Sequence, residues 1–139
     1  MVESSRVALV LDDERVVLAV FRKALQNHGF VVLAAETAEA ALRWSDDRQL
    51  RIDLFVADVI IPGAASGTDV VLQVRASRPD LPVLLTSGTP QDAWSAEDSR
   101  NVAALPPDSY SFLQKPFTVR TFMDSVEELL ARKTPLHTA

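Results

Sequence analysis

The segment VALVLDD, residues 7–13, decides the fold, because five consecutive apolar residues run directly into two aspartates. Three further segments repeat this arrangement of an apolar run that ends in polar side chains: LFVAD at 54–58, VLLTS at 83–87 and FLQKP at 112–116. Short apolar runs that are separated by helical patterns are typical of buried parallel strands. The sequence therefore predicts a parallel sheet whose strands end in polar groups.

Helical and strand patterns alternate along nearly the whole chain. Val17, Leu18, Phe21 and Leu25 recur at helical spacing, and Gly29 suits the left-handed position past the end of that helix. Five such alternations indicate an α/β fold, a doubly wound parallel sheet with helices on both faces. We expect strands at 6–11, 31–34, 54–57, 83–86 and 109–113, and helices at 14–27, 68–77 and 118–132.

Two further helices are predicted from weaker patterns. Thr37 is a suitable N-cap for one of them, which places Ala40, Ala41 and Trp44 on its inner face. The other is a short helix near 91–101. The folded domain is expected to span 6–132, and segments 1–5 and 133–139 are expected to be flexible tails.

Composition and charge narrow the class of protein. The chain has 139 residues, which favours one domain with its own core, and it has a net charge of −5. The acidic balance argues against duplex nucleic acid as a direct partner, and the absence of cysteine excludes disulfides and thiolate metal sites. The apolar runs are far shorter than the roughly 18 residues of a membrane span, and residues 1–6 lack a signal-peptide core. We therefore expect a cytoplasmic protein without membrane insertion.

The polar groups at the strand ends predict a binding site. In an open parallel sheet, ligands gather in the crevice beyond the carboxyl ends of the strands. Asp12, Asp13, Asp58, Ser87 and Lys115 would converge there, and three carboxylates, a hydroxyl and an ammonium suit a divalent cation and a phosphoryl group. Taken singly, the aspartates could also be loop or helix caps, and the lysine an ordinary surface residue.

The same residues resemble the receiver domain of two-component response regulators. The matching pieces, in the family's order, are residues 11–14, Asp58 with 62–63, residues 86–88 and residues 115–117. The resemblance covers about 7–132. It implies a flavodoxin-like three-layer sandwich with a five-stranded sheet in the order 2-1-3-4-5.

The resemblance also implies roles for the acidic residues. Asp58 would be the phosphoacceptor, since a carboxylate can attack phosphorus to give an acyl phosphate. Asp12, Asp13 and Asp58 would hold Mg²⁺, with the backbone carbonyl of Ile60 as a further ligand. A hard cation relieves the repulsion between clustered carboxylates.

The remaining site residues follow from the same resemblance. Lys115 would pair with phosphoryl oxygens, and the peptide bond before Pro116 is predicted to be cis. Ser87 is the expected switch hydroxyl, with Thr86 as its rival on the opposite face of the strand. Phe112 occupies the place of an aromatic residue that changes rotamer on activation in many receivers. It is either such a switch or part of the core.

The implied function is that of a signalling switch that turns over no separate metabolite. Its phosphoryl donor would be a histidine kinase or a histidine phosphotransfer protein, and a homodimer through the helix 4–strand 5–helix 5 face is possible in the family. One extra residue between Pro62 and Gly67 and a longer segment between Ser87 and Lys115 depart from the usual pattern. A pseudo-receiver that binds partners without phosphorylation, and a haloacid-dehalogenase-type phosphatase, are the alternatives. A stand-alone receiver is favoured over a fragment of a longer regulator.

Overall fold

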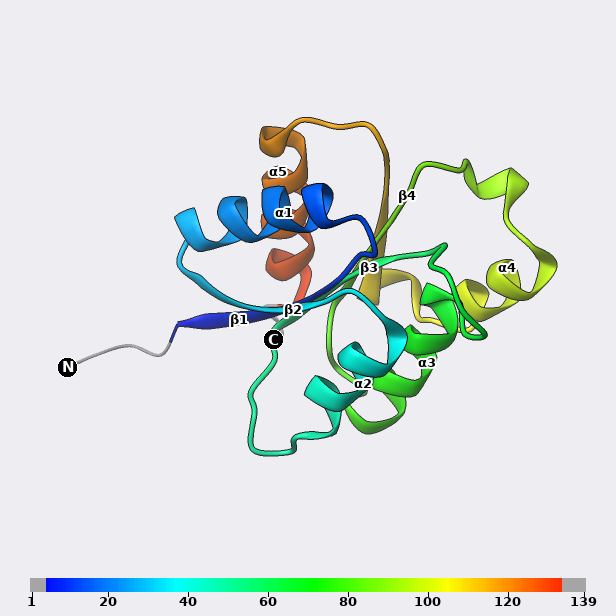
Figure 1. Cartoon of the computed structure of the whole chain (residues 1–139), viewed down its shortest axis with the longest axis horizontal. Coiled ribbons are helices and arrows are strands. Elements are labelled where there is room, and N and C mark those ends of the chain that lie inside the picture. Colours follow the sequence, from blue (N-terminus) through cyan, green and yellow to red (C-terminus); the bar gives the residue numbers. More distant parts are fainter. Residues whose placement is uncertain (1–4, 134–139) are drawn as a thin grey trace.

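A computed structural model describes residues 5–133 (Figure 1). Strands and helices alternate, and all neighbouring strands pair in parallel, in the order β2-β1-β3-β4-β5. The strands are β1 (Arg6–Leu11), β2 (Phe30–Ala35), β3 (Leu54–Asp58), β4 (Val83–Ser87) and β5 (Tyr110–Gln114). The helices are α1 (Arg15–Asn27), α2 (Ala38–Asp46), α3 (Gly67–Ser77), α4 (Ala96–Ala103) and α5 (Val119–Lys133), with 3-10 turns η1 (Gln91–Ala93) and η2 (Pro107–Ser109).

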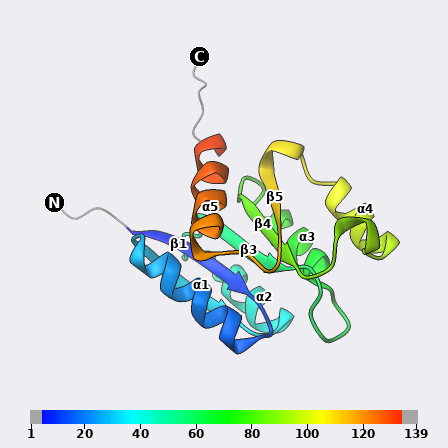
Figure 2. The same cartoon turned by 90° about the horizontal axis from the view of Figure 1, so that it is seen from above.

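The helices cover both faces of the sheet. Helices α1 and α5 pack on one face, and α2, α3 and α4 pack on the other, as Figure 2 shows. The three central strands are buried on both faces, which explains their uninterrupted apolar runs. The edge strand β2 is less completely buried, with Val31 49% exposed and Val32 and Ala34 half-buried. The predicted doubly wound three-layer architecture and strand order are confirmed.

Local signals set most of the element boundaries. Thr37 caps α2, and its hydroxyl accepts a hydrogen bond from the amide of Ala40 at 3.1 Å. Gly29 follows α1 with a φ of +88°, the left-handed conformation that was expected of it. The buried stripe of α5 contains Phe122, Val126 and Leu129, again as predicted.

Some element predictions were wrong in detail. Helix α4 begins at Ala96, after the separate turn η1, so the predicted single helix over 91–101 is two elements. Trp44 is 37% exposed rather than on the inner face of α2, because its indole N–H donates to the carbonyl of Ala34 at the edge of the sheet. The predicted tails lie mostly outside the described residues, but Lys133 is the last residue of α5.

None of the helices within residues 5–133 combines the length and the apolar character that crossing a bilayer requires.

Candidate functional site

Three aspartates meet at the carboxyl ends of β1 and β3. These strands are hydrogen-bonded neighbours, with Leu11 opposite Ala57, so the residues that follow lie side by side. One carboxylate oxygen from each of Asp12, Asp13 and Asp58 lies within 4.8 Å of the others. Asp12 and Asp58 are buried and Asp13 is half-buried. This cluster is the acidic site that the sequence predicted.

Lys115 reaches the cluster from the end of β5. Its Nζ lies 3.0 Å from Oδ2 of Asp12, 3.4 Å from Oδ2 of Asp58 and 3.5 Å from Oε1 of Glu14. The peptide bond between Lys115 and Pro116 is cis, as predicted. A single ammonium therefore faces several carboxylates, which leaves the site with excess negative charge.

Burial and like charge change how these groups titrate. Burial raises the pKa of Asp58 to about 6, and the neighbouring Asp12 adds to the rise, although Lys115 opposes it. Burial also raises the pKa of Asp12 above its ordinary value. Burial lowers the pKa of Lys115, but its contacts with the two aspartates outweigh this and leave it above the ordinary value. The fold thus holds carboxylates that are costly to ionise together unless a cation joins them.

An open cavity of about 270 Å³ gives access to the cluster. The amide of Ile60 donates to Oδ1 of Asp58 at 3.3 Å, while the Ile60 side chain is half exposed to solvent. Ile60 thus lies at the cavity, where its carbonyl remains a predicted ligand. The lining residues are Asp13, Glu14, Asp58, Ile60, Ser87, Gly88, Thr89 and Lys115.

Of the two candidate hydroxyls on β4, Ser87 lines this cavity and Thr86 does not. Oγ of Ser87 accepts a hydrogen bond from the amide of Thr89 at 3.0 Å. The side chain of Thr86 is fully buried, and its Oγ1 has no hydrogen-bond partner within residues 5–133. Ser87 is thus the hydroxyl that lies at the cavity, and its role as the switch hydroxyl stays a prediction.

The desolvated hydroxyl of Thr86 yields a stability prediction. Thr86→Val keeps the shape of the side chain and removes a buried unpaired polar group, so we expect the free energy of unfolding to rise by about 1 kcal/mol. Thr37→Val is the matched control and should lower it by about 1 kcal/mol, because the Thr37 hydroxyl caps α2. Urea unfolding of both variants measures the two effects. A loss of stability in Thr86→Val would contradict the prediction.

Phe112 lies on β5, half-buried beside the core. Its ring packs edge-on against Trp94, with ring centroids 5.0 Å apart and planes at 89°. The indole N–H of Trp94 donates to the carbonyl of Thr89, at 2.9 Å. Phe112 is therefore in contact with the segment between β4 and α4, and a rotamer switch at Phe112 stays a prediction.

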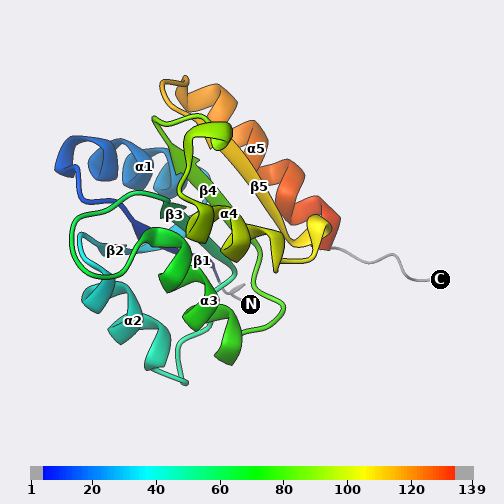
Figure 3. The ribbon, with the colours of Figure 1, turned by 90° about the vertical axis from the view of Figure 1, so that its right-hand side faces the viewer.

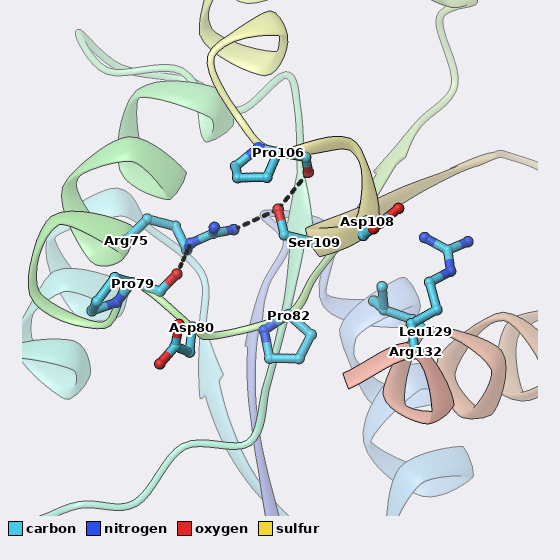
Figure 4. Close-up of a pocket in the computed structure, with 9 residues that line it drawn as sticks. All are labelled: Arg75, Pro79, Asp80, Pro82, Pro106, Asp108, Ser109, Leu129 and Arg132. Carbon is cyan, nitrogen blue, oxygen red and sulfur yellow. Dashed lines mark hydrogen bonds between the residues drawn. The ribbon is translucent and has the colours of Figure 1, made fainter. Parts of the chain in front are cut away.

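Another cavity, of about 500 Å³, lies far from these residues, where β4 and β5 begin (Figure 4). Arg75 donates there to the carbonyl of Pro79 and to the hydroxyl of Ser109, both at 3.1 Å. Arg132 donates to the carbonyl of Tyr110 at 3.0 Å. The two arginines that line this cavity thus hold neighbouring segments together, and the cavity is not part of the candidate site.

The structure brings together the five strand-end side chains that the sequence singled out, and it adds residues that the sequence did not assign. Glu14 contacts Lys115, although it was quoted only as part of a motif. Gly67 packs directly on the backbone of Asp58, where a Cβ would lie 1.7 Å from the carbonyl oxygen. In the sequence, only the position of Glu14 next to Asp13 indicates that Glu14 belongs to the site. Nothing in the sequence indicates the contact of Gly67.

Comparison with known proteins agrees with this geometry. The family model described as the response regulator receiver domain matches residues 8–127. The chain is 36% identical over 132 residues to the transcriptional regulatory protein PrrA of Mycobacterium bovis, covering 95% of this chain and 52% of PrrA. It is 30% identical over 130 residues to the sensor kinase CckA of Brucella abortus, covering 93% of this chain and 13% of CckA. The chain thus spans about half or less of the length of these relatives.

Solved structures give the same result. A response regulator receiver protein from Sinorhizobium medicae superposes with a TM-score of 0.80 at 26% identity, covering 94% of this chain and 98% of that one. The receiver domain of the hybrid histidine kinase CckA superposes with a TM-score of 0.71 at 27% identity, covering 89% and 98%. With the strand order and the acidic cluster in place, the chain belongs to the response regulator receiver domain family.

Proposed function

We propose that this protein is a phosphorylation-controlled switch in which Asp58 accepts a phosphoryl group from a histidine of a kinase or phosphotransfer protein. One Oδ atom of Asp58 would form the new P–O bond while the P–N bond of the donor breaks. The observation that carries the proposal is the position of Asp58, buried beside two further aspartates and 3.4 Å from the ammonium of Lys115. Receiver homologues, including the CckA receiver, support it.

The donor set fits Mg²⁺, since carboxylate oxygens of Asp12, Asp13 and Asp58 face one another and carry excess negative charge. When bound, the cation would neutralise charge on the phosphoryl oxygens. Asp13 and Asp58 would bind it directly, Asp12 partly through water, and the carbonyl of Ile60 would complete the protein's share. Asp13 and Asp58 line the cavity and the fully buried Asp12 does not, which favours this division.

Ser87 and Lys115 would bind the phosphoryl group and respond to it. Lys115 already lies at the phosphoacceptor and can exchange its contact with Asp12 for one with a phosphoryl oxygen. Ser87 would give up its hydrogen bond from the Thr89 amide and donate to the phosphoryl group, which draws the loop after β4 inward. The acyl phosphate thereby shifts a two-state equilibrium, and hydrolysis resets it.

Several finer features remain predictions of the same proposal. We expect no turnover of a separate metabolite, a cytoplasmic location, no direct contact with nucleic acid, and an output through protein contacts, with the α4–β5–α5 face available for a homodimer. The phosphatase alternative would require a nucleophile after β1. Asp12 is fully buried there and is bonded by the amide of Glu14 and by Lys115, which disfavours attack.

Intact mass after incubation with Mg²⁺ and acetyl phosphate tests the proposal. Wild type is expected to gain one phosphoryl group, and neither Asp58→Asn nor wild type in EDTA should gain it. Asp53→Asn, which removes a half-buried aspartate before β3, serves as a matched variant that should still be phosphorylated. An adduct on Asp58→Asn, or none on wild type, would refute the proposal, and the latter would favour a pseudo-receiver.

A further inference from the structure

A partly buried polar cluster joins α4 to the first turn of α3, the two helices that lie side by side in Figure 3. Asp98 of α4 is 7% exposed, and its Oδ1 accepts hydrogen bonds from Oγ of Ser66, at 2.7 Å, and from Oγ1 of Thr68. Asn101, one turn later, donates to Oγ1 of Thr68 and to Oδ1 of Asp69, both at 3.0 Å. Two polar residues of α4 are thus bound to three residues at the start of α3.

The residues of α3 in this cluster end the loop that begins at the phosphoacceptor. Ser66 is the N-cap of α3 and forms a reciprocal capping box with Asp69. The next residue, Gly67, donates its amide hydrogen to the carbonyl of Val59 at 2.8 Å and lies against the backbone of Asp58. Asp98 therefore holds a turn that is packed directly on the candidate site.

The other end of the α4 segment is tied to the switch hydroxyl. Ser87 accepts from the amide of Thr89, the carbonyl of Thr89 accepts from the indole of Trp94, and Trp94 packs against Phe112. Trp94 directly precedes Ser95, which is the N-cap of α4. A movement of Ser87 toward a phosphoryl group on Asp58 would therefore pull the chain at the start of α4.

We propose that Asp98, Ser66, Thr68 and Asn101 form a latch that opposes the switching movement and is linked to the occupancy of Asp58. The latch residues have two distinct states. When α4 is packed against α3, the Asp98 carboxylate is buried and accepts hydrogen bonds from neutral hydroxyls. When α4 is displaced, the carboxylate is hydrated instead. This inference rests on the proposed function for its ligand, while the latch itself is a property of the unmodified protein.

The latch is tested first without any phosphoryl ligand. Thr68→Val removes one donor to Asp98 at constant shape, and Asp98→Asn removes the charge that the hydroxyls bind. Since a hydrogen bond to a charged group is worth roughly a factor of ten or more in an equilibrium constant, amides 96–103 of α4 should exchange with deuterium about tenfold faster in both variants.

Glu97→Gln is the matched control, because it changes the same charge in the same turn on an exposed side chain. The deuterium exchange of the α4 amides should be the same in this variant as in wild type. This result would separate the latch from the general effect of losing a negative charge near the N-terminus of α4. Unchanged exchange in Thr68→Val and Asp98→Asn would overturn the latch.

The linkage to Asp58 is tested by titration with beryllofluoride in Mg²⁺. A Trp44→Phe background leaves Trp94 as the single tryptophan, so its fluorescence reports on the segment before α4. Coupling between two sites is reciprocal. Latch variants should therefore bind beryllofluoride about fivefold or more tighter, and in the protein with an unaltered latch beryllofluoride should speed the deuterium exchange of the α4 amides.

The outcomes separate the two proposals. If wild type takes no phosphoryl group, the proposed function fails, while the exchange experiment still decides the latch. Equal affinity for beryllofluoride in variants that exchange faster would overturn the linkage, and tighter binding with faster exchange supports it.

Discussion

Gly67→Ala is expected to lower the free energy of unfolding by roughly 3 kcal/mol, because the new methyl group has no place to go. A Cβ at this position would lie 1.7 Å from the carbonyl oxygen of Asp58, 2.7 Å from its carbonyl carbon and 3.0 Å from Cα of Val59. All three atoms belong to the backbone, so no side-chain rotation relieves the clash. Either α3 or the end of β3 must shift, and the second shift moves Asp58, the proposed phosphoacceptor.

Two measurements check this expectation. Urea unfolding should show the loss of stability, and phosphorylation by acetyl phosphate should fall if the end of β3 is the part that shifts, since that shift displaces Asp58 from Lys115. Gly88→Ala is the control, because Gly88 also lines the site and a Cβ there meets nothing within 4 Å. That variant should stay within about 0.5 kcal/mol of wild type. Comparable stability of the two variants would contradict the close packing at Gly67.

Asp58→Asn is expected to stabilise the metal-free protein by roughly 3 kcal/mol at pH 7, because the ionised Asp58 is buried next to Asp12. Folding raises the pKa of Asp58 from 3.8 to about 6. Between these two pH values the folded state binds more protons than the unfolded state, so the contribution of Asp58 to the free energy of unfolding falls as the pH rises. The cost of ionisation is absent below about pH 4 and complete above about pH 6.

The pH dependence gives the prediction its distinctive form. In EDTA, the difference in unfolding free energy between Asp58→Asn and wild type should be small at pH 4 and should grow through pH 6. Asp124→Asn removes an exposed carboxylate on α5 and should show no such growth. Mg²⁺ should stabilise wild type more than Asp58→Asn, because the cation relieves the repulsion that the variant lacks. A difference that does not change with pH would contradict a buried, repelled carboxylate.

The strand-end residues were predictable from the sequence because their geometry follows from one topological rule. Parallel strands in a doubly wound sheet all present their carboxyl ends at the same edge. Asp12, Asp13, Asp58, Ser87 and Lys115 each follow an apolar run, so identifying the strands was enough to bring their side chains together. The preference for Ser87 over Thr86 rests on the count from Pro82 and on the following Gly88, and alternation along β4 then turns Thr86 to the opposite face.

Other features were decided only by the tertiary structure. Residue spacing predicted an inward Trp44, yet the edge of the sheet leaves that side chain exposed. The sequence assigns no role to Gly67, and only the packing of α3 against β3 shows that a hydrogen atom is all that fits there. The sequence assigns no role to Asp98, and only the packing of α4 against α3 brings its carboxylate to Ser66, 32 residues earlier in the chain.

The physical reason for this division lies in the range of the interactions. Periodicity, caps and turn residues act over a few neighbours, so VALVLDD and the three other apolar runs that end in polar residues determined the class of fold and the chemistry at the carboxyl ends of the strands. Contacts such as Asp98 with Thr68, or Gly67 with Asp58, depend on how two already formed elements meet in space. The local sequence does not determine how two such elements pack, so only the tertiary structure decided these contacts.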